Sequence, residues 1–267
     1  MPRLILCSDD FAFSRGVSET IAGLAQAGKL NAISCMSVMP GWADDSRLLS
    51  GLPGHVEIGL HLTLTGERPL TAMPRLTLDG SLPEIASLHR LAVRGGLPLG
   101  EIAAEVSAQF DAFIAAMGCP PAFVDGHQHS HALPGIRDIV LRETARRAPD
   151  AWVRDCRDRL SAMLVRPFPG KAIGSAWHSR GLRRAAVAHG LKTNDSFAGH
   201  YDFASDYLDL FPRFLRRPGA KHLVMCHPGA GERAGDAVAA ARPREAEALR
   251  NLSIADIAAA EGLAFPA

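Results

Sequence analysis

The sequence predicts an α/β protein with a parallel sheet and helices packed outside it. Short apolar segments typical of buried strands alternate with segments of helical spacing along the whole chain. Turns rich in Gly and Pro separate the segments, and no repeat or low-complexity tract interrupts them. The chain has 267 residues, 47% of them hydrophobic, which is enough for one barrel-sized core. We therefore expect a single domain over residues 1–267.

Each expected element follows from a local pattern. Ser14 is a suitable N-cap for the first helix and Gly28 a suitable stop. Apolar runs that end in polar residues predict strands at 4–7, 32–39, 56–64, 122–125, 151–154 and 222–226. Helical spacing predicts helices at 14–27, 42–49, 99–117, 134–147, 179–189 and 242–261. The segment 66–100 is rich in Gly and Pro and is expected to be a long excursion.

Charge and cysteine content narrow the class of protein. The formal net charge is +1, so we expect no nucleic-acid partner. Local arginine clusters at 142–147 and 180–184 are interpreted as solvated helix faces, with anion binding as the alternative. The five cysteines form no C-x-x-C pair, which favours a reducing compartment. The first residues show no signal segment, and no apolar run reaches the roughly 18 residues of a membrane span. We expect a cytoplasmic protein with no membrane span.

Polar side chains follow several of the expected strands. Asp9 and Asp10 follow the first strand, His61 ends the third, and His127 and His227 follow later ones. The carboxyl ends of parallel strands meet on one face of such folds, and that face forms the site. The sequence therefore predicts that these five side chains gather there.

Two of these motifs have competing interpretations. Adjacent carboxylates such as Asp9 and Asp10 repel each other unless one binds a cation, but Asp-Asp pairs are also common in turns. The segment 125–131, DGHQHSH, places three histidines at alternating positions directly after an apolar strand. That spacing suits ligands on an extended face or in a loop that turns them inward, whereas a surface loop is the less favoured interpretation.

Two imidazoles and one carboxylate from separate strand ends form a common layout for a catalytic divalent metal. A structural zinc site would be closed by four ligands, usually with cysteine, and no suitable cysteine set exists. We expect a divalent metal cofactor, with Mg or Zn favoured. His227 could then serve as a general acid, or it could simply cap the turn formed by Pro228 and Gly229.

Motifs along nearly the whole chain resemble the YdjC-like carbohydrate deacetylase family. They are CSDDF at 7–11, IGLHLTLT at 58–65, PLTAMP at 69–74, FVDGHQHSH at 123–131, LKTND at 191–195 and CHPG at 226–229. The resemblance implies an irregular (β/α) barrel of the glycoside hydrolase/deacetylase type. It also implies an enzyme that removes an N-acetyl group from an amino sugar or oligosaccharide. One departure stands out, because Ala12 replaces the glycine that often ends the first motif.

The resemblance also implies roles for individual residues. Asp10, His61 and His127 would bind the metal, Asp9 would be the catalytic base, and His227 the acid. Arg154 could pair with Asp9 and keep it ionised, or form only a surface salt bridge. The residues expected to bind the substrate are Arg154, Asn194, Asp195, His129 and His131. The expected partner is an N-acetylated sugar, and a homodimer is a family-level expectation.

Two other functions remain open at this stage. A glycosidase would need two carboxylates, for which Asp9 and Asp125 are available, and it should survive removal of metal. A metal-dependent sugar-binding protein would show saturable binding without acetate release.

Overall fold

The computed structural model describes residues 1–230, 233 and 235–266. Its centre is one eight-stranded sheet in which every neighbouring pair is parallel. The strand order is β6-β5-β4-β3-β2-β1-β8-β7. The strands are β1 (Arg3–Phe11), β2 (Ala32–Cys35), β3 (Glu57–Leu62), β4 (Phe123–Gly126), β5 (Trp152–Val153), β6 (Lys192–Thr193), β7 (Ser196–Ala198) and β8 (Lys221–Cys226).

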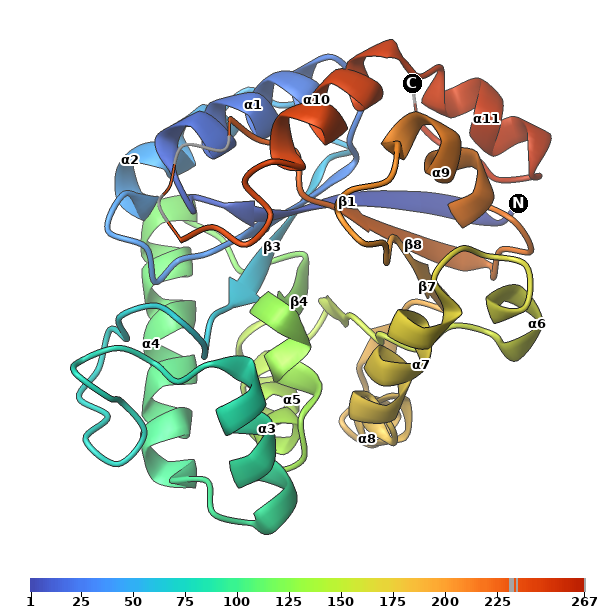
Figure 1. Ribbon diagram of the computed structural model, residues 1–267. Coiled ribbons are helices and arrows are strands. Elements are labelled where there is room, and N and C mark those ends of the chain that lie inside the picture. The colour runs from blue at the N-terminus through green and yellow to red at the C-terminus, as the bar shows by residue number, and fades with distance from the viewer. Residues whose placement is uncertain (231–232, 234, 267) are drawn as a thin grey trace.

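The sheet curls into a barrel that is nearly closed. Strands β6 and β7 occupy its two edges, yet only Asn194 and Asp195 separate them along the chain. The two edges must therefore lie close together, and the helices surround the sheet on its outside (Figure 1). The predicted irregular (β/α) barrel is confirmed.

The helices follow the strands as a parallel sheet requires. The 3-10 helices are η1 (Ser46–Leu49) and η2 (His127–Ala132). The α-helices are α1 (Arg15–Gln26), α2 (Trp42–Asp45), α3 (Ile85–Arg94), α4 (Leu99–Met117), α5 (Ile136–Arg147), α6 (Leu160–Met163), α7 (Pro169–His178), α8 (Leu182–Ala188), α9 (Tyr207–Phe214), α10 (Arg242–Asn251) and α11 (Ile254–Ala260). Among the described residues, no helix is long and apolar enough to cross a bilayer.

Several boundaries differ from expectation. The strand expected to reach residue 39 ends at Cys35, because Met36 to Met39 close a turn through a backbone hydrogen bond of 3.2 Å. The helix expected over 242–261 breaks at Leu252, whose extended backbone separates α10 from α11. Helices α3, α6, α7 and α9 lie in segments where no helix was expected, and strands β6 and β7 were not expected either.

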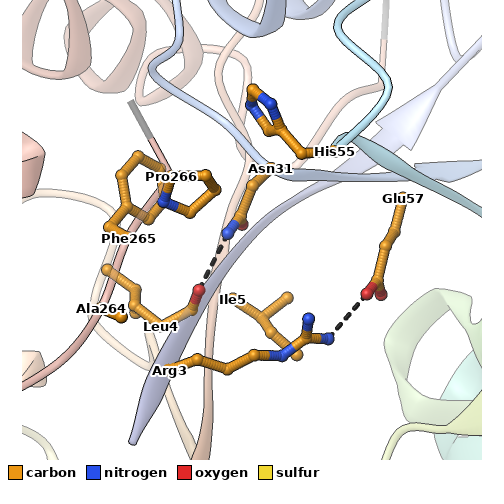
Figure 2. A pocket seen from close by; sticks show the side chains of 9 residues that line it. All are labelled: Arg3, Leu4, Ile5, Asn31, His55, Glu57, Ala264, Phe265 and Pro266. Carbon is orange, nitrogen blue, oxygen red and sulfur yellow. Dashed lines mark hydrogen bonds and ion pairs between the residues drawn. The ribbon is translucent and has the colours of Figure 1, made fainter. Parts of the chain in front are cut away.

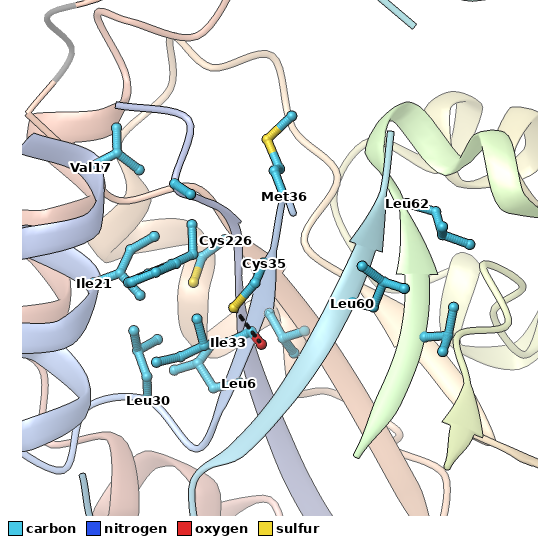
Figure 3. Packing of buried hydrophobic residues seen from close by; sticks show 14 of the residues in the cluster. Leu6, Val17, Ile21, Leu30, Ile33, Cys35, Met36, Leu60, Leu62 and Cys226 are labelled. Carbon is cyan, nitrogen blue, oxygen red and sulfur yellow. Dashed lines mark hydrogen bonds between the residues drawn. The ribbon is translucent and has the colours of Figure 1, made fainter. Parts of the chain in front are cut away.

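The alternation of side chains along β1 divides the core into two layers. Leu4 and Leu6 belong to the outer layer, which packs with the helices. Figure 3 draws part of this layer and labels Leu6 in it. Ile5 and Cys7 belong to the second cluster, which includes Phe123. Space in that cluster is tight, since a Cβ on Gly59 would lie 2.4 Å from the Phe123 ring. Glycine is therefore required at position 59 for the barrel to close around the aromatic ring.

The register of β1 becomes irregular at its carboxyl end. Ser8 pairs with Ile33, but Phe11 pairs with Cys35, so β1 holds one residue more than β2 across this interval. Asp10 takes up the difference with a left-handed backbone (φ 66°). Such a bulge reorients side chains beside an active site, and here it directs two successive carboxylates into different surroundings.

Candidate metal centre and active site

Asp10, His61 and His127 converge at the carboxyl edge of the sheet. Asp10 Oδ1 lies 3.0 Å from His127 Nδ1 and 3.5 Å from His61 Nε2. The three ligand atoms lie within 4.8 Å of one another. Asp10 and His61 are buried, while His127 is partly exposed. The predicted gathering of these three side chains is therefore present in the structure.

His61 is oriented by a carboxylate behind it. Its Nδ1 lies 2.6 Å from Asp125 Oδ1, and Ser34 Oγ donates to the same oxygen over 2.5 Å. The other ring nitrogen, Nε2, is thereby left facing Asp10. Metal-binding histidines in proteins commonly have such a carboxylate partner, which fixes the ring and raises its basicity. Burial alone would lower the pKa of His61, but Asp125 and Asp10 raise it to about 10.

Asp10 is held ionised by positive groups on both of its oxygens. Arg242 on α10 donates to Oδ2 over 2.8 Å, while His127 contacts Oδ1. Burial alone would raise the pKa of Asp10, but His127, His61 and Arg242 together hold it well below its usual range. The site therefore presents a carboxylate at neutral pH.

The donor set fits a divalent cation. One carboxylate oxygen and two imidazole nitrogens come from three different strand ends, and the imidazole Nε2 of His61 is oriented from behind. Three protein ligands leave positions for water or substrate, as in catalytic sites. A second cluster of potential ligands, formed by Cys7, Asp9 and Asp125, is different. The Arg154 guanidinium already fills it, contacting all three side chains.

Asp9 faces the interior of the barrel, away from the partners of Asp10. Arg154 binds both of its oxygens in a bidentate pair, each bond 2.6 Å long. Arg154 is fully buried and also forms an ion pair with Asp125. Burial alone would raise the pKa of Asp9, but Arg154 lowers it below its usual range. The expected pairing of Arg154 with Asp9 is present, as a buried bridge between two carboxylates.

His227 stands on the other side of Asp9. Its Nε2 lies 4.0 Å from Asp9 Oδ2. Glu245 on α10 fixes its backbone, accepting from the His227 amide over 2.5 Å. Tyr201 donates to the second oxygen of Glu245, and burial raises the pKa of that carboxyl. Glu245 thus fixes the backbone of His227, and the imidazole packs edge-on against the Phe203 ring at a centroid distance of 5.5 Å.

The remaining histidines of the motif have different surroundings. His131 is fully buried, and its Nε2 lies 2.9 Å from the Arg154 carbonyl oxygen. Burial lowers the pKa of His131 to about 4, so it stays neutral and supports Arg154. His129 is only partly buried and packs against His200 and Phe197. His129 also has a left-handed backbone (φ 60°), a strained conformation of the kind often found at functional sites.

Asn194 and Asp195 lie at the seam of the barrel and not beside the metal ligands. Asn194 is fully buried and exchanges hydrogen bonds of 2.7 and 2.8 Å with the backbone of Asp155. Asp195 accepts a hydrogen bond from the amide of Lys221 over 2.9 Å. Lys221 is the first residue of β8, so this contact lies at the amino edge of the sheet, opposite the edge that carries the metal-ligand candidates. The structure therefore gives both residues a role in closing the barrel.

Sequence reasoning missed four supporting residues. Asp125 was considered only as a glycosidase carboxylate, and Ser34, Arg242 and Glu245 were not considered. Asp125 is fully buried, with one oxygen on His61 and Ser34 and the other on Arg154, so no oxygen is left for a sugar. A signal existed for Asp125, since it precedes the histidine motif. The residues of α10 gave no such signal, because helical charged residues normally face solvent.

A hollow of about 400 Å³ lies at the opposite, amino edge of the sheet (Figure 2). Arg3 donates to Glu57 across its floor over 2.6 Å, and Asn31 donates to the Leu4 carbonyl over 2.9 Å. Arg3, Glu57 and Asn31 are thus already hydrogen-bonded within the protein, and the metal-ligand candidates end their strands at the other edge. This hollow adds nothing to the site.

The fold and the site define a class: an α/β barrel with an open two-histidine, one-aspartate centre at its carboxyl edge. Residues 3–260 match the model of the family described as YdjC-like protein. The chain therefore belongs to the YdjC-like family.

A solved structure from Enterococcus faecalis, described as a candidate cellobiose-phosphate cleavage protein, has the same fold. It superposes with a TM-score of 0.74 at 17% identity, covering 99% of this chain and 97% of that one.

Two curated relatives of this chain are named chitooligosaccharide deacetylases. A chitooligosaccharide deacetylase of Proteus mirabilis is 35% identical over 145 residues, which are 54% of this chain. The aligned part spans 56% of that relative, so about half of its length is matched. A chitooligosaccharide deacetylase of Escherichia fergusonii is 29% identical over 227 residues, 84% of this chain and 81% of that protein.

Proposed function

We propose that the chain is a metal-dependent carbohydrate deacetylase that hydrolyses the N-acetyl group of an amino sugar or oligosaccharide. The observation that carries the proposal is the convergence of Asp10, His61 and His127 within 4.8 Å of one another, with Asp9 and His227 beside them. The names of the relatives support a carbohydrate substrate.

Asp10, His61 and His127 would hold the ion. Two imidazoles and one carboxylate suit Zn better than Mg, which prefers an oxygen shell. When bound, a divalent ion supplies Lewis-acid polarisation of the acetamide carbonyl and lowers the pKa of water.

Asp9 and His227, which lie beside the three metal-ligand candidates, carry out the proton transfers. Asp9 is kept ionised by Arg154 and accepts the proton of the attacking water. His227 donates the proton from Nε2 to the nitrogen as the carbon–nitrogen bond breaks. The products are acetate and the free amine. The 4.0 Å between His227 Nε2 and Asp9 Oδ2 supports this assignment, because two groups so close together can reach the same amide.

Space for further sugar units exists between two loops that leave the carboxyl edge of the sheet. A hollow of about 620 Å³ is lined by residues 38–40, 42 and 43, which follow β2, and residues 66–70, which follow β3. Both segments leave the carboxyl edge of the sheet. An ion pair of 2.7 Å between Glu67 and Arg233 forms part of its wall. The volume is suitable for a small oligosaccharide.

The test is acetate release from N-acetylglucosamine and its short oligomers. The protein would be stripped with chelator and reloaded with Zn or Mg, with Asp10→Asn as the matched control. We expect release only from the reloaded wild type. Sugar binding without acetate would support a binding protein, and new reducing ends from chelated protein would support a glycosidase. A cytoplasmic location, a homodimer and a single domain stay predictions.

A further inference from the structure

Residues 157–192 differ in charge from the rest of the chain. This segment holds eight Lys and Arg residues and one Asp, a net charge of +7, whereas the whole chain has +1. The one acidic residue, Asp158, is buried and paired with Arg166 over 2.7 Å. The segment therefore presents positive charge only.

Five basic side chains of the segment are exposed: Arg159, Lys171, Arg180, Arg184 and Lys192. Within the part of the chain that the structure describes, none of the five has a carboxylate at ion-pair distance. Three more exposed arginines follow in and after α9, at positions 213, 216 and 217. Unpaired positive charge on one segment favours an anionic partner.

The same segment exposes large apolar side chains. Leu160 is 81% exposed and Leu164 is 84% exposed, one turn apart at α6. Ile173 and Trp177 are 59% and 66% exposed, also one turn apart, on α7. Helices α6, α7 and α8 lie on the side of the molecule away from α1 and α2 (Figure 1).

We propose that helices α6 to α8 form a surface that binds anionic membranes, inserting Leu160, Leu164, Ile173 and Trp177 among lipid headgroups. Cationic residues around exposed Leu, Ile and Trp are the composition of an interfacial membrane anchor. A nucleic acid would use the charges but would not require the aliphatic side chains. A second copy of this chain would bring equal positive charge against the surface. The proposal is independent of the proposed function.

Binding would bring the candidate active site close to the lipid. The hydroxyl of Ser175 on α7 lies 2.7 Å from Nε2 of His200, which packs against His129 of η2. Lys171 on α7 donates to the Tyr201 carbonyl. Helix α7 therefore connects the membrane-binding surface to the turn that carries the histidine motif.

Vesicle flotation tests the proposal, with phosphatidylcholine vesicles and with vesicles containing roughly 30% phosphatidylglycerol, which carry a negative surface potential. We expect binding to the anionic vesicles and its loss in high salt. Trp177 is the exposed tryptophan, since Trp42 and Trp152 are 3% and 5% exposed. Its fluorescence should shift to the blue on binding, and Trp177→Phe should abolish that shift.

The double variant Ile173→Ser/Trp177→Ser should lower vesicle binding by about 10-fold or more. The matched control is Leu78→Ser/Val93→Ser, which removes side chains of 76% and 64% exposure outside the segment and should bind as the wild type does. Circular dichroism and turnover of a small soluble substrate establish that each variant folds. Equal loss in both variants, or no binding to anionic vesicles, would overturn the proposal. So would a dimer in solution that only the Ile173/Trp177 variant dissociates.

Discussion

Asp9 and Asp10 are neighbours on one strand, yet they lie in two different halves of the site. Asp9 faces the barrel interior, where Arg154 binds both of its oxygens. Asp10 faces helix α10 and the histidines, where Arg242 takes one oxygen and leaves the other toward His61 and His127. The left-handed backbone at Asp10 separates the two.

The difference shows how two adjacent carboxylates can both stay charged in different surroundings. Each has its own buried arginine, which offsets the cost of burying the charge. Arg154 satisfies Asp9 by hydrogen bonds and keeps it ionised. The free oxygen of Asp10, in contrast, points at imidazole nitrogens and is suited to share a cation with them.

The largest expected effect separates the two carboxylates by function. Asp10→Asn should lower metal affinity by at least about 100-fold, since it removes a charged ligand. Asp9→Asn should keep the metal and lower turnover by about 10²–10⁴-fold, the contribution typical of a general base. Metal content by mass spectrometry and kcat of the reloaded proteins measure both. Equal metal loss in the two variants would contradict the division of roles.

The next effect concerns the two arginines. Arg154→Met leaves Asp9 and Asp125 buried without the guanidinium that pairs with them, and Arg242→Met does the same for Asp10. Each variant should lower the free energy of unfolding by about 3–5 kcal/mol. Added metal should restore much of the loss in the Arg242 variant, because the ion can compensate Asp10. It should restore little in the Arg154 variant. Melting temperatures with and without metal measure this, and equal rescue would refute it.

A smaller effect is the coupling of metal uptake to pH. The pKa of His61 is raised to about 10, so without metal its imidazolium contributes stability below about pH 6.5 that is lost as pH rises through about 10. A metal needs the neutral ring. Binding at pH 7 should therefore release about one proton from His61, and affinity should rise with pH. Calorimetry in two buffers of different ionisation enthalpy measures the release, and a value near zero would exclude it.

The smallest effect concerns the turn that follows β1. Ala12 has a left-handed backbone (φ 74°), which costs an alanine about 1 kcal/mol relative to glycine. Ala12→Gly should therefore stabilise the chain slightly, by up to about 1 kcal/mol. The control is Ala25→Gly in α1, where the same change should destabilise by about 1 kcal/mol. Urea unfolding measures both; destabilisation at position 12 would contradict the strain assigned to Ala12 in the turn after β1.

The sequence by itself determined the alternation of strands and helices, and with it the edge of the sheet where the site lies. Apolar runs such as residues 4–7 and 222–226 are local signals, and the geometry of parallel strands places their carboxyl ends together. Asp10, His61 and His127 could be predicted to meet for this reason. The fold of the histidine motif could not, because its spacing is equally compatible with a strand and with the 3-10 turn observed.

Only the tertiary structure decided which groups surround each carboxylate. Arg154 and Arg242 lie 145 and 232 residues from their aspartates, and no local pattern records such pairings. Asn194 and Asp195 were expected at the substrate because they lie in a matching motif, whereas closure of the barrel places them at its seam. Hydrophobic periodicity sets where a chain turns and what it buries; the partners of a buried charge depend on how the curled sheet brings distant segments together.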